Sequence, residues 1–207
     1  MNSHLQIISG KFKGRKLSIP PNARPTQNRA RIALFNMLAG ILRTANHQPP
    51  ATIWDAFAGS GAFGIEFLSR NWAAHAIFTD NDAGAVKAIE RNLAGFGGNT
   101  FTIRKTNATA AAREFAPAAD VVFVDAPYDA PDTGEIFIAE FAAHARPGAM
   151  VAWEMEDGIR YSDTAFEGFE VLKDKKYGRA RFLIMQKIIP DTVSEYRRSK
   201  NASTETL

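Results

Sequence analysis

The strongest constraint on the fold is a regular alternation of short apolar segments with segments of helical periodicity through the middle of the chain. Repeated strand–helix units require crossover connections, which build a parallel sheet covered by helices. The segment at 120–125, Asp-Val-Val-Phe-Val-Asp, is almost wholly apolar, as expected of a central strand buried on both faces. The predicted strands are 52–58, 75–80, 100–106, 120–125 and 149–154, and the predicted helices are 61–70, 83–93, 108–115 and 134–145.

The two ends of the chain depart from this alternation. Residues 5–19 carry short apolar runs around two glycines, which predict a hairpin, and apolar residues recur at helical spacing from 29 to 42. Near the other end, segments 169–172 and 180–186 are strand-like with no helix between them, so they should form an antiparallel hairpin at a sheet edge. We expect three regions: a basic N-terminal appendage (1–50), an α/β domain (51–189) and a flexible polar tail (190–207).

Charge is distributed unevenly along the chain. Residues 1–54 contain eight Lys or Arg and no Asp or Glu, although the net charge of the whole chain is only +3. A long block of one sign predicts a polyanionic partner, and a solvated basic surface is the alternative. The predicted nucleic-acid contacts are Lys11, Lys13, Arg15, Lys16, Arg24, Arg29 and Arg31.

The chain contains no cysteine, and this absence excludes several kinds of chemistry. The chain can form no thiolate zinc site, no cysteine-held iron–sulfur cluster and no cysteine nucleophile. Methyl transfer that uses an iron–sulfur cluster or a cysteine adduct is therefore excluded. The four histidines have no metal-ligand spacing, so no metal site is predicted. No apolar run approaches the roughly 18 residues of a membrane helix, and the N-terminus lacks a secretory pattern, so we expect a cytoplasmic protein without a membrane partner.

A glycine-rich turn follows the first predicted strand of the α/β region. Gly59, Gly61 and Gly64 form the pattern G-x-G-x-x-G between a strand and a helix, where free backbone N–H groups can meet a ligand. Asp80 ends the next strand, 21 residues after Gly59, where it can accept hydrogen bonds from ribose hydroxyls. Nicotinamide, flavin and S-adenosylmethionine enzymes all bind a nucleoside at such a crevice. A glycine-rich turn without a ligand is a further alternative.

Two features favour S-adenosylmethionine among these cofactors. Asp55 lies four residues before Gly59, and a carboxylate there suits the cationic amino end of a methionine but would repel a pyrophosphate. The fourth predicted strand runs into Asp125-Ala126-Pro127-Tyr128. Asp125 and the carbonyl of Ala126 can accept the two hydrogens of an exocyclic amine while Tyr128 stacks on the base. A plain strand-to-loop turn with a tyrosine lid is the structural alternative.

These motifs together resemble one family. Asp55-Ala-Phe-Ala-Gly-Ser-Gly, Asp125-Ala-Pro-Tyr and the N-terminal Arg24-Pro-Thr are similar to the bacterial 16S ribosomal RNA guanine-N2 methyltransferases of the RsmD type. The opening Ile8-Ser-Gly-Lys-Phe-Lys-Gly-Arg-Lys-Leu also matches that family, and the resemblance runs from Ile7 to Lys187. It implies a class I S-adenosylmethionine-dependent methyltransferase fold, with a seven-stranded, mainly parallel sheet whose last strand is antiparallel.

The same resemblance assigns an activity, partners and further site residues. It implies methylation of the N2 amine of a guanine in 16S rRNA, within a small-subunit assembly particle, by a protein that we expect to be a monomer. Asn107-Ala108 should meet the adenine ring, although Asn107 can equally cap a helix over 108–115. The predicted catalytic residues are Asp125, Ala126, Pro127 and Tyr128, and the predicted cofactor-binding residues are Asp55, Ala58, Gly59, Ser60, Gly61, Asp80, Asn81, Asn107, Ala108 and Asp125.

The chain departs from the family pattern at two places. Ala126 stands where the family usually has the first proline of Asp-Pro-Pro-Tyr, which keeps the backbone carbonyl but loses the restriction on φ. Gln27-Asn28-Arg29 replaces the common Thr-Asp-Arg and removes an acid. Three other functions therefore stay open: a nicotinamide-dependent oxidoreductase, an RNA-binding or ribosome-assembly factor with weakened catalysis, and an adenine-N6 or DNA amine methyltransferase.

Overall fold

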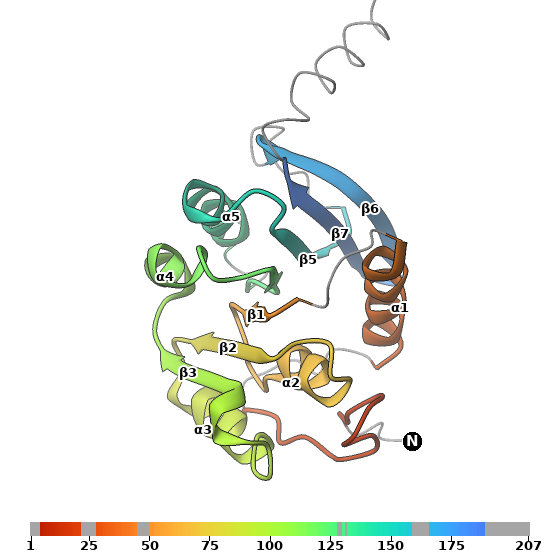
Figure 1. The fold of residues 1–207 in the computed structure, drawn as a ribbon, viewed down its shortest axis with the longest axis vertical. Coiled ribbons are helices and arrows are strands. Elements are labelled where there is room, and N and C mark those ends of the chain that lie inside the picture. The colour runs from red at the N-terminus through yellow and green to blue at the C-terminus, as the bar shows by residue number, and fades with distance from the viewer. Residues whose placement is uncertain are drawn as a thin grey trace, which may run out of the picture.

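The computed structural model describes residues 5–21, 28–44, 50–127, 130, 132–158 and 166–188. A seven-stranded sheet in the order β3-β2-β1-β4-β5-β7-β6 forms the centre, with helices on both of its faces (Figure 1). The strands are β1 (Thr52–Asp55), β2 (His75–Asp80), β3 (Phe101–Lys105), β4 (Val121–Val124), β5 (Met150–Glu156), β6 (Phe169–Tyr177) and β7 (Ala180–Lys187). The helices are α1 (Asn28–Thr44), α2 (Ala62–Ser69), α3 (Ala83–Asn92), the short 3-10 helix η1 (Gly98–Thr100), α4 (Ala108–Phe115) and α5 (Asp132–His144).

The predicted α/β class and the parallel core of the sheet are confirmed. β1 pairs in parallel with both β2 and β4, and β4 pairs in parallel with β5. β4 lies at the middle of the sheet, as its apolar sequence predicts, and all four of its residues are buried. The antiparallel C-terminal hairpin is also confirmed, because β7 runs antiparallel to both β5 and β6.

Two predicted strands end three or more residues away from their ends in the structure. β1 ends at Asp55 rather than Ala58, because the chain leaves the sheet there to form the glycine-rich turn. β6 runs to Tyr177, with a bulge between Val171 and Lys173, although sequence analysis ended this strand at Leu172. The charged run that was read as a connection is an exposed edge strand, where lysines are well tolerated.

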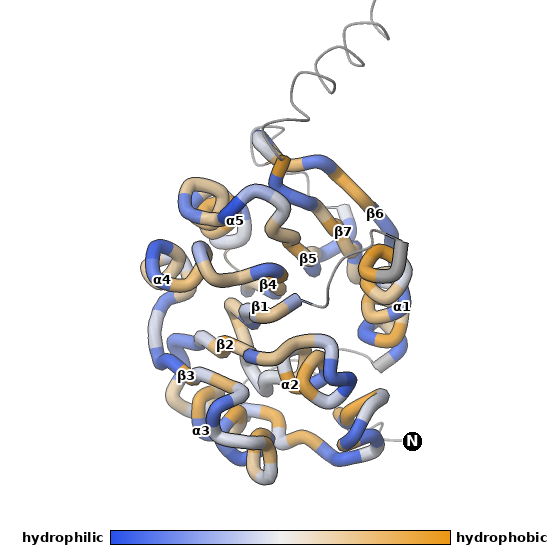
Figure 2. The backbone as a smooth tube through the Cα atoms, viewed as in Figure 1, coloured by the Kyte–Doolittle hydropathy of each residue, from blue (hydrophilic) through white to orange (hydrophobic). Residues whose placement is uncertain are grey.

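Two apolar clusters fill the space between the sheet and its helices. One cluster joins the N-terminal segment, α1, α2 and α3 to one face of the sheet, and the other joins α4 and α5 to the opposite face. Hydrophobic and hydrophilic residues alternate along the N-terminal segment and α1, as the tube in Figure 2 shows. Within the described residues, no helix is both long enough and apolar enough to span a membrane.

The N-terminal segment, residues 5–17, forms a small antiparallel pairing that packs into the first cluster. Gln6 bridges Lys16, and the Leu17 N–H donates to the Leu5 carbonyl at 2.9 Å, in agreement with the predicted hairpin. Leu5, Ile7 and Leu17 are buried beside residues of α1 and α2. The described part of the N-terminal region therefore shares its core with the sheet. The predicted domain boundary near residue 50 adjoins residues 45–49, and the predicted tail covers residues 190–207. Both of these segments lie outside the described ranges.

Gly10 holds the N-terminal segment against the end of α2. Its φ is +84°, and a Cβ at this position would overlap the backbone carbonyl of Ser69. The neighbouring Lys11 N–H donates to that same carbonyl at 2.7 Å, and the Phe12 N–H donates to Ser69 Oγ at 3.1 Å. The contact thus requires a residue without a side chain.

Gly14 provides a matched comparison for this contact, because its φ is +83° but a Cβ there would meet no atom within 4 Å. We expect Gly14→Ala to lower the free energy of unfolding by about 1–2 kcal/mol, the cost of a left-handed backbone for an L residue. Gly10→Ala should cost distinctly more, because the overlap with Ser69 adds to that cost. Urea denaturation of both variants measures the difference, and equal losses would contradict the proposed close contact.

Candidate functional site

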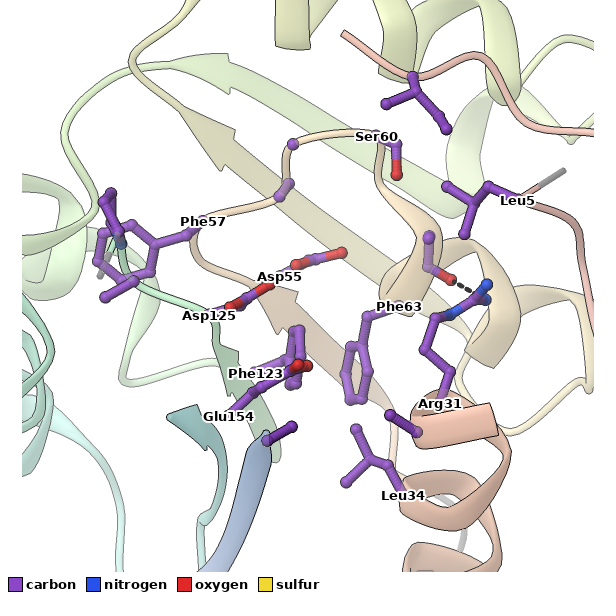
Figure 3. Close-up of a pocket in the computed structure, with 18 of the residues that line it drawn as sticks. Leu5, Arg31, Leu34, Asp55, Phe57, Ser60, Phe63, Phe123, Asp125 and Glu154 are labelled. Carbon is purple, nitrogen blue, oxygen red and sulfur yellow. Dashed lines mark hydrogen bonds between the residues drawn. The ribbon is translucent and has the colours of Figure 1, made fainter. Parts of the chain in front are cut away.

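A pocket of about 980 Å³ opens at the carboxyl ends of the central strands (Figure 3). The chain crosses from β3, on one side of β1, to β4 on its other side, and ligands of open α/β sheets bind at such a reversal of strand order. Eight of the predicted site residues line the pocket: Asp55, Ala58, Gly59, Ser60, Asp80, Asp125, Ala126 and Pro127. Gly61, Asn81, Asn107 and Ala108 are described but are not among the lining residues.

The three glycines of the turn have different tasks. Gly59 has a φ of +52°, and a Cβ on it would meet no atom within 4 Å, so the space above the turn is open to a ligand. Gly61 has a φ of +74° and lies against the side chains of Ile65, Ile89 and Phe78. A Cβ on Gly64 would overlap the Phe78 ring, so this glycine lets α2 approach the sheet closely.

Asp80 fixes the turn from the end of β2. Its Oδ2 accepts the Gly59 N–H at 2.8 Å, and its Oδ1 accepts the Asp82 N–H at 2.9 Å. A carboxylate oxygen can accept two hydrogen bonds, so each oxygen keeps room for one more donor. Asp80 is partly buried, whereas Asn81 is exposed and Asp82 caps α3 by accepting the Ala85 N–H at 2.8 Å.

Asp55 lies at the end of β1 and is almost completely buried. Its Oδ2 accepts the Gly64 N–H at 3.0 Å. The pKa of Asp55 is raised to about 8, first by burial and then by the charges of Asp125 and Asp80, while the Gly64 N–H and Arg31 oppose the rise. A cation bound beside Asp55 would favour its ionised form, so the site has the chemistry to hold an ammonium group.

Asp125 and Ala126 follow the end of β4, one strand away from Asp55. Figure 3 shows the Asp55 and Asp125 carboxyl groups close to each other at the same side of the pocket. Burial raises the pKa of Asp125, although its side chain is still partly accessible from the pocket. The predicted stacking residue, Tyr128, lies outside the described residues.

An aromatic pair forms another wall of the pocket. The rings of Phe63 and Phe123 stack with their centroids 4.1 Å apart and their planes at 12°. Both residues are buried and line the pocket, Phe63 from α2 and Phe123 from β4. Sequence analysis missed this pair, because a stack between residues 60 positions apart has no local signal.

Glu154 is the second functional candidate that sequence analysis missed. It lies on β5 with 5% of its surface exposed, and among the described residues its Oε2 has no hydrogen-bond partner. Burial raises the pKa of Glu154, the charge of Asp125 raises it further, and Arg31 opposes the rise. The available signal was an acid inside the apolar segment 149–154, on a strand next to the one that precedes Asp125.

Asn107 and Ala108 begin α4 at the end of β3. The Asn107 side chain accepts the Ala110 N–H at 3.1 Å, so its predicted role as a helix cap is confirmed. Asn107 is exposed and Ala108 is buried. Their contact with an adenine ring stays a prediction.

Arg31, one of the predicted nucleic-acid contacts, has a buried side chain. It is 5% exposed, and its guanidinium donates to the carbonyls of Gln6 and Ala62, each at 3.1 Å. It also lies 3.5 Å from the Glu66 carboxylate. Burial lowers the pKa of Arg31, and the charge of Glu66 opposes that effect. Arg31 therefore joins α1 to the N-terminal segment and to α2.

The other predicted nucleic-acid contacts differ in exposure. Lys11, Lys13, Lys16 and Arg29 are exposed and Arg15 is partly buried, whereas Arg24 lies outside the described residues. Phe12 and Phe96 pack with ring centroids 4.1 Å apart, and the Arg15 guanidinium lies 5.8 Å and 5.9 Å from these two rings. The cations of the N-terminal segment thus lie beside a pair of packed phenylalanine rings.

Known proteins are similar to this chain in sequence and in fold. The Escherichia coli K12 protein named Ribosomal RNA small subunit methyltransferase D is 36% identical over 129 residues, which is 61% of this chain and 62% of that protein. A structure described as a putative methyltransferase from Escherichia coli superposes with a TM-score of 0.73 at 28% identity, covering 89% of this chain and 98% of that one. A Thermus thermophilus 16S rRNA methyltransferase, solved with AdoMet and guanosine, shares the fold with a TM-score of 0.60 at 18% identity, over 81% of this chain and 45% of that one.

The family follows from the extent of the match to its sequence model. The model described as Conserved hypothetical protein 95 matches residues 5–186, which include the N-terminal segment, the glycine-rich turn and both hairpin strands at the sheet edge. Together with the strand order, this match shows that the chain belongs to the Conserved hypothetical protein 95 family, of the RsmD type, and has the class I S-adenosylmethionine-dependent methyltransferase fold.

Proposed function

We propose that this protein is an S-adenosylmethionine-dependent methyltransferase that modifies the exocyclic N2 amine of a guanine in 16S rRNA. The observation that carries the proposal is the position of two buried acids in one pocket: Asp55 beside the glycine-rich turn and Asp125 at the end of the adjacent strand. Membership of the RsmD-type family and the named relative support the choice of rRNA. We further propose a monomer that acts in the cytoplasm on a small-subunit assembly particle.

The residues of the turn fit S-adenosylmethionine. The open space above Gly59 admits a ligand close to the backbone, Asp80 has acceptor capacity left for ribose hydroxyls, and Asp55 suits an ammonium group. When bound, this cofactor supplies a methyl group already activated by a sulfonium, so the chain needs no nucleophile of its own.

Asp125 and Ala126 would align the accepting nitrogen. The carboxylate and the Ala126 carbonyl accept the two amine hydrogens, which directs the nitrogen lone pair toward the methyl group. Asp125 also offsets the positive charge that develops on the nitrogen during transfer. Burial raises the pKa of Asp125, and N–H donors from the bound amine favour its ionised form.

The exposed cations of the N-terminal segment would hold the RNA backbone. Lys11, Lys13 and Lys16 are close in sequence and exposed, as phosphate contacts require. Such contacts position an RNA without reading its sequence. The choice of base must therefore come from the pocket.

The decisive experiment supplies labelled S-adenosylmethionine with unmodified small-subunit particles or with naked 16S rRNA. Nuclease digestion and mass spectrometry then locate the methyl group, and we expect N2-methylguanosine at one position. RNA binding without methyl incorporation would instead identify a non-catalytic assembly factor. Methyl on adenine N6 or on DNA would identify the other amine methyltransferase, and calorimetric binding of NAD in place of S-adenosylmethionine would identify an oxidoreductase.

Asp125→Asn tests the catalytic assignment. The amide keeps the size of the carboxyl but cannot carry its charge, so we expect the rate of methyl transfer to fall by about 100-fold or more. The affinity for S-adenosylmethionine, measured by calorimetry, should change only a few-fold. Asp132→Asn, an exposed residue on α5, is the matched control and should behave like the wild type. Near-normal transfer by Asp125→Asn would rule out the assigned role.

The salt dependence of RNA binding tests the basic segment. Each phosphate contact contributes a slope of about −0.7 to −0.9 in a plot of log affinity against log salt. Replacing Lys11, Lys13 and Lys16 together by Ala should make the slope shallower by about two to three units. Arg113→Ala, an exposed site on α4 across the sheet, should leave it unchanged. An RNA affinity of the wild-type protein that does not change with salt concentration would contradict electrostatic binding of the RNA backbone.

A further inference from the structure

Glu154 and Asp125 lie at the carboxyl ends of neighbouring parallel strands. Val124 of β4 is in register with Trp153 of β5, so the next residues of the two segments, Asp125 and Glu154, face the same end of the sheet. Neighbouring strands are about 4.8 Å apart, which lets two carboxyl groups reach one small ligand. Both residues line the pocket, and Figure 3 shows Glu154 beside Phe123, on the pocket side of the strand.

The free oxygen of Glu154 has no structural explanation in the described residues. Buried carboxylates that serve the fold are normally bonded at both oxygens, as Glu66 is in this protein. Glu154 is nearly as buried, yet its Oε2 lacks a partner within the described ranges. Arg31 lines the same pocket and its charge acts on Glu154, and the Arg31 Nε lacks a hydrogen-bond partner within the described residues.

We propose that Glu154 is a specificity-determining residue that accepts the N1–H of the guanine whose N2 amine is held by Asp125. This inference rests on the proposed function. Guanine presents two neighbouring donors, N1–H and the N2 amine, whereas the amines of adenine and cytosine adjoin a ring nitrogen that is an acceptor. Two adjacent acceptor side chains therefore select guanine. With adenine or cytosine, the lone pair of the ring nitrogen would face the lone pair of the second acceptor.

The role proposed for Glu154 requires its carboxyl group to be ionised when the guanine is bound. In the free protein, burial and the neighbouring Asp125 favour the neutral carboxyl. A guanine N–H that donates to the carboxyl stabilises its charged form, and Arg31 acts in the same direction. A carboxyl that remained protonated would donate instead, and it would favour a base with an acceptor beside the amine.

The test compares RNAs that carry guanine or 2-aminopurine at the methylated position, prepared by ligation of synthetic segments. 2-Aminopurine keeps the amine at C2, but its N1 is an acceptor without a hydrogen. We expect the wild type to prefer guanine by at least about 10-fold in kcat/KM, the discrimination typical of one well-placed base contact. Dissociation constants of both RNAs, measured without cofactor, should show a preference in the same direction.

Glu154→Gln should reduce this preference toward one. The amide keeps the size of the side chain and can turn its NH2 toward the N1 acceptor of 2-aminopurine, so guanine loses activity while 2-aminopurine gains or keeps it. Glu170→Gln is the matched control, because Glu170 is exposed on β6 and does not line the pocket. This control should leave the guanine preference unchanged. The loss of O6 in 2-aminopurine affects every variant alike and cancels in the comparison.

The outcomes separate this inference from the proposed function. If the wild type methylates guanine and Glu154→Gln keeps the same guanine preference as the wild type, the role of Glu154 is overturned and the proposed function stays intact. A wild-type preference near one also overturns it, even if Glu154→Gln fails to fold. Glu154→Asp, which keeps an acceptor on a shorter side chain, should retain the guanine preference with lower activity. Absence of N2 methylation on the guanine RNA refutes the proposed function itself.

Discussion

The buried carboxylate of Glu66 joins the N-terminal segment to α2, the helix that follows the glycine-rich turn. Its Oε2 accepts the Ile8 N–H at 2.7 Å, its Oε1 accepts the Ser9 N–H at 2.9 Å, and the Arg70 Nε–H donates to Oε1 at 2.6 Å. Arg31 lies on the other side at 3.5 Å, so two cations and two backbone donors surround one anion with no solvent exposure. α2, which carries Glu66, begins directly after the glycine-rich turn. The same contact therefore orients the cofactor turn and anchors the basic N-terminal segment, and removal of one partner from such a network is strongly destabilising.

The pocket has the opposite electrostatic character, because its acids are buried with little compensation. Asp55, Asp125 and Glu154 all have raised pKa values, caused first by burial, and the charge of Asp125 raises the pKa of both others. A cluster of buried acids that outnumber the cations around them is costly for the fold and is typical of a binding site. An ammonium group at Asp55 and N–H donors at Asp125 and Glu154 would each relieve part of that cost. The electrostatics of the pocket thus match the ligands proposed from its geometry.

Sequence alone predicted the fold and named eight residues that line one pocket, and what it missed has physical causes. Strand and helix periodicity is local, so β2 and α4 are placed at their observed bounds. Arg29 and Arg31 looked alike in sequence, but residues two apart on a helix point about 200° apart, so one is exposed and the other is buried. Glu154 was hidden for a related reason, because its importance depends on its neighbour across the sheet, and strand order is not a local property.

Residues of the N-terminal region also contribute to the wall of the pocket. Leu5, Ile19, Pro20 and Leu34 line the pocket together with the strand ends. Leu5 and Leu34 are also buried in the core that includes α2, so the wall that they form is continuous with the fold. Under the proposed function, a cationic surface and a pocket wall built on one packed unit would hold a bound RNA backbone at a fixed distance from Asp125. Selection of a nucleotide would then require two conditions at once: a backbone position that the lysines accept and a base whose edge matches Asp125 and Glu154.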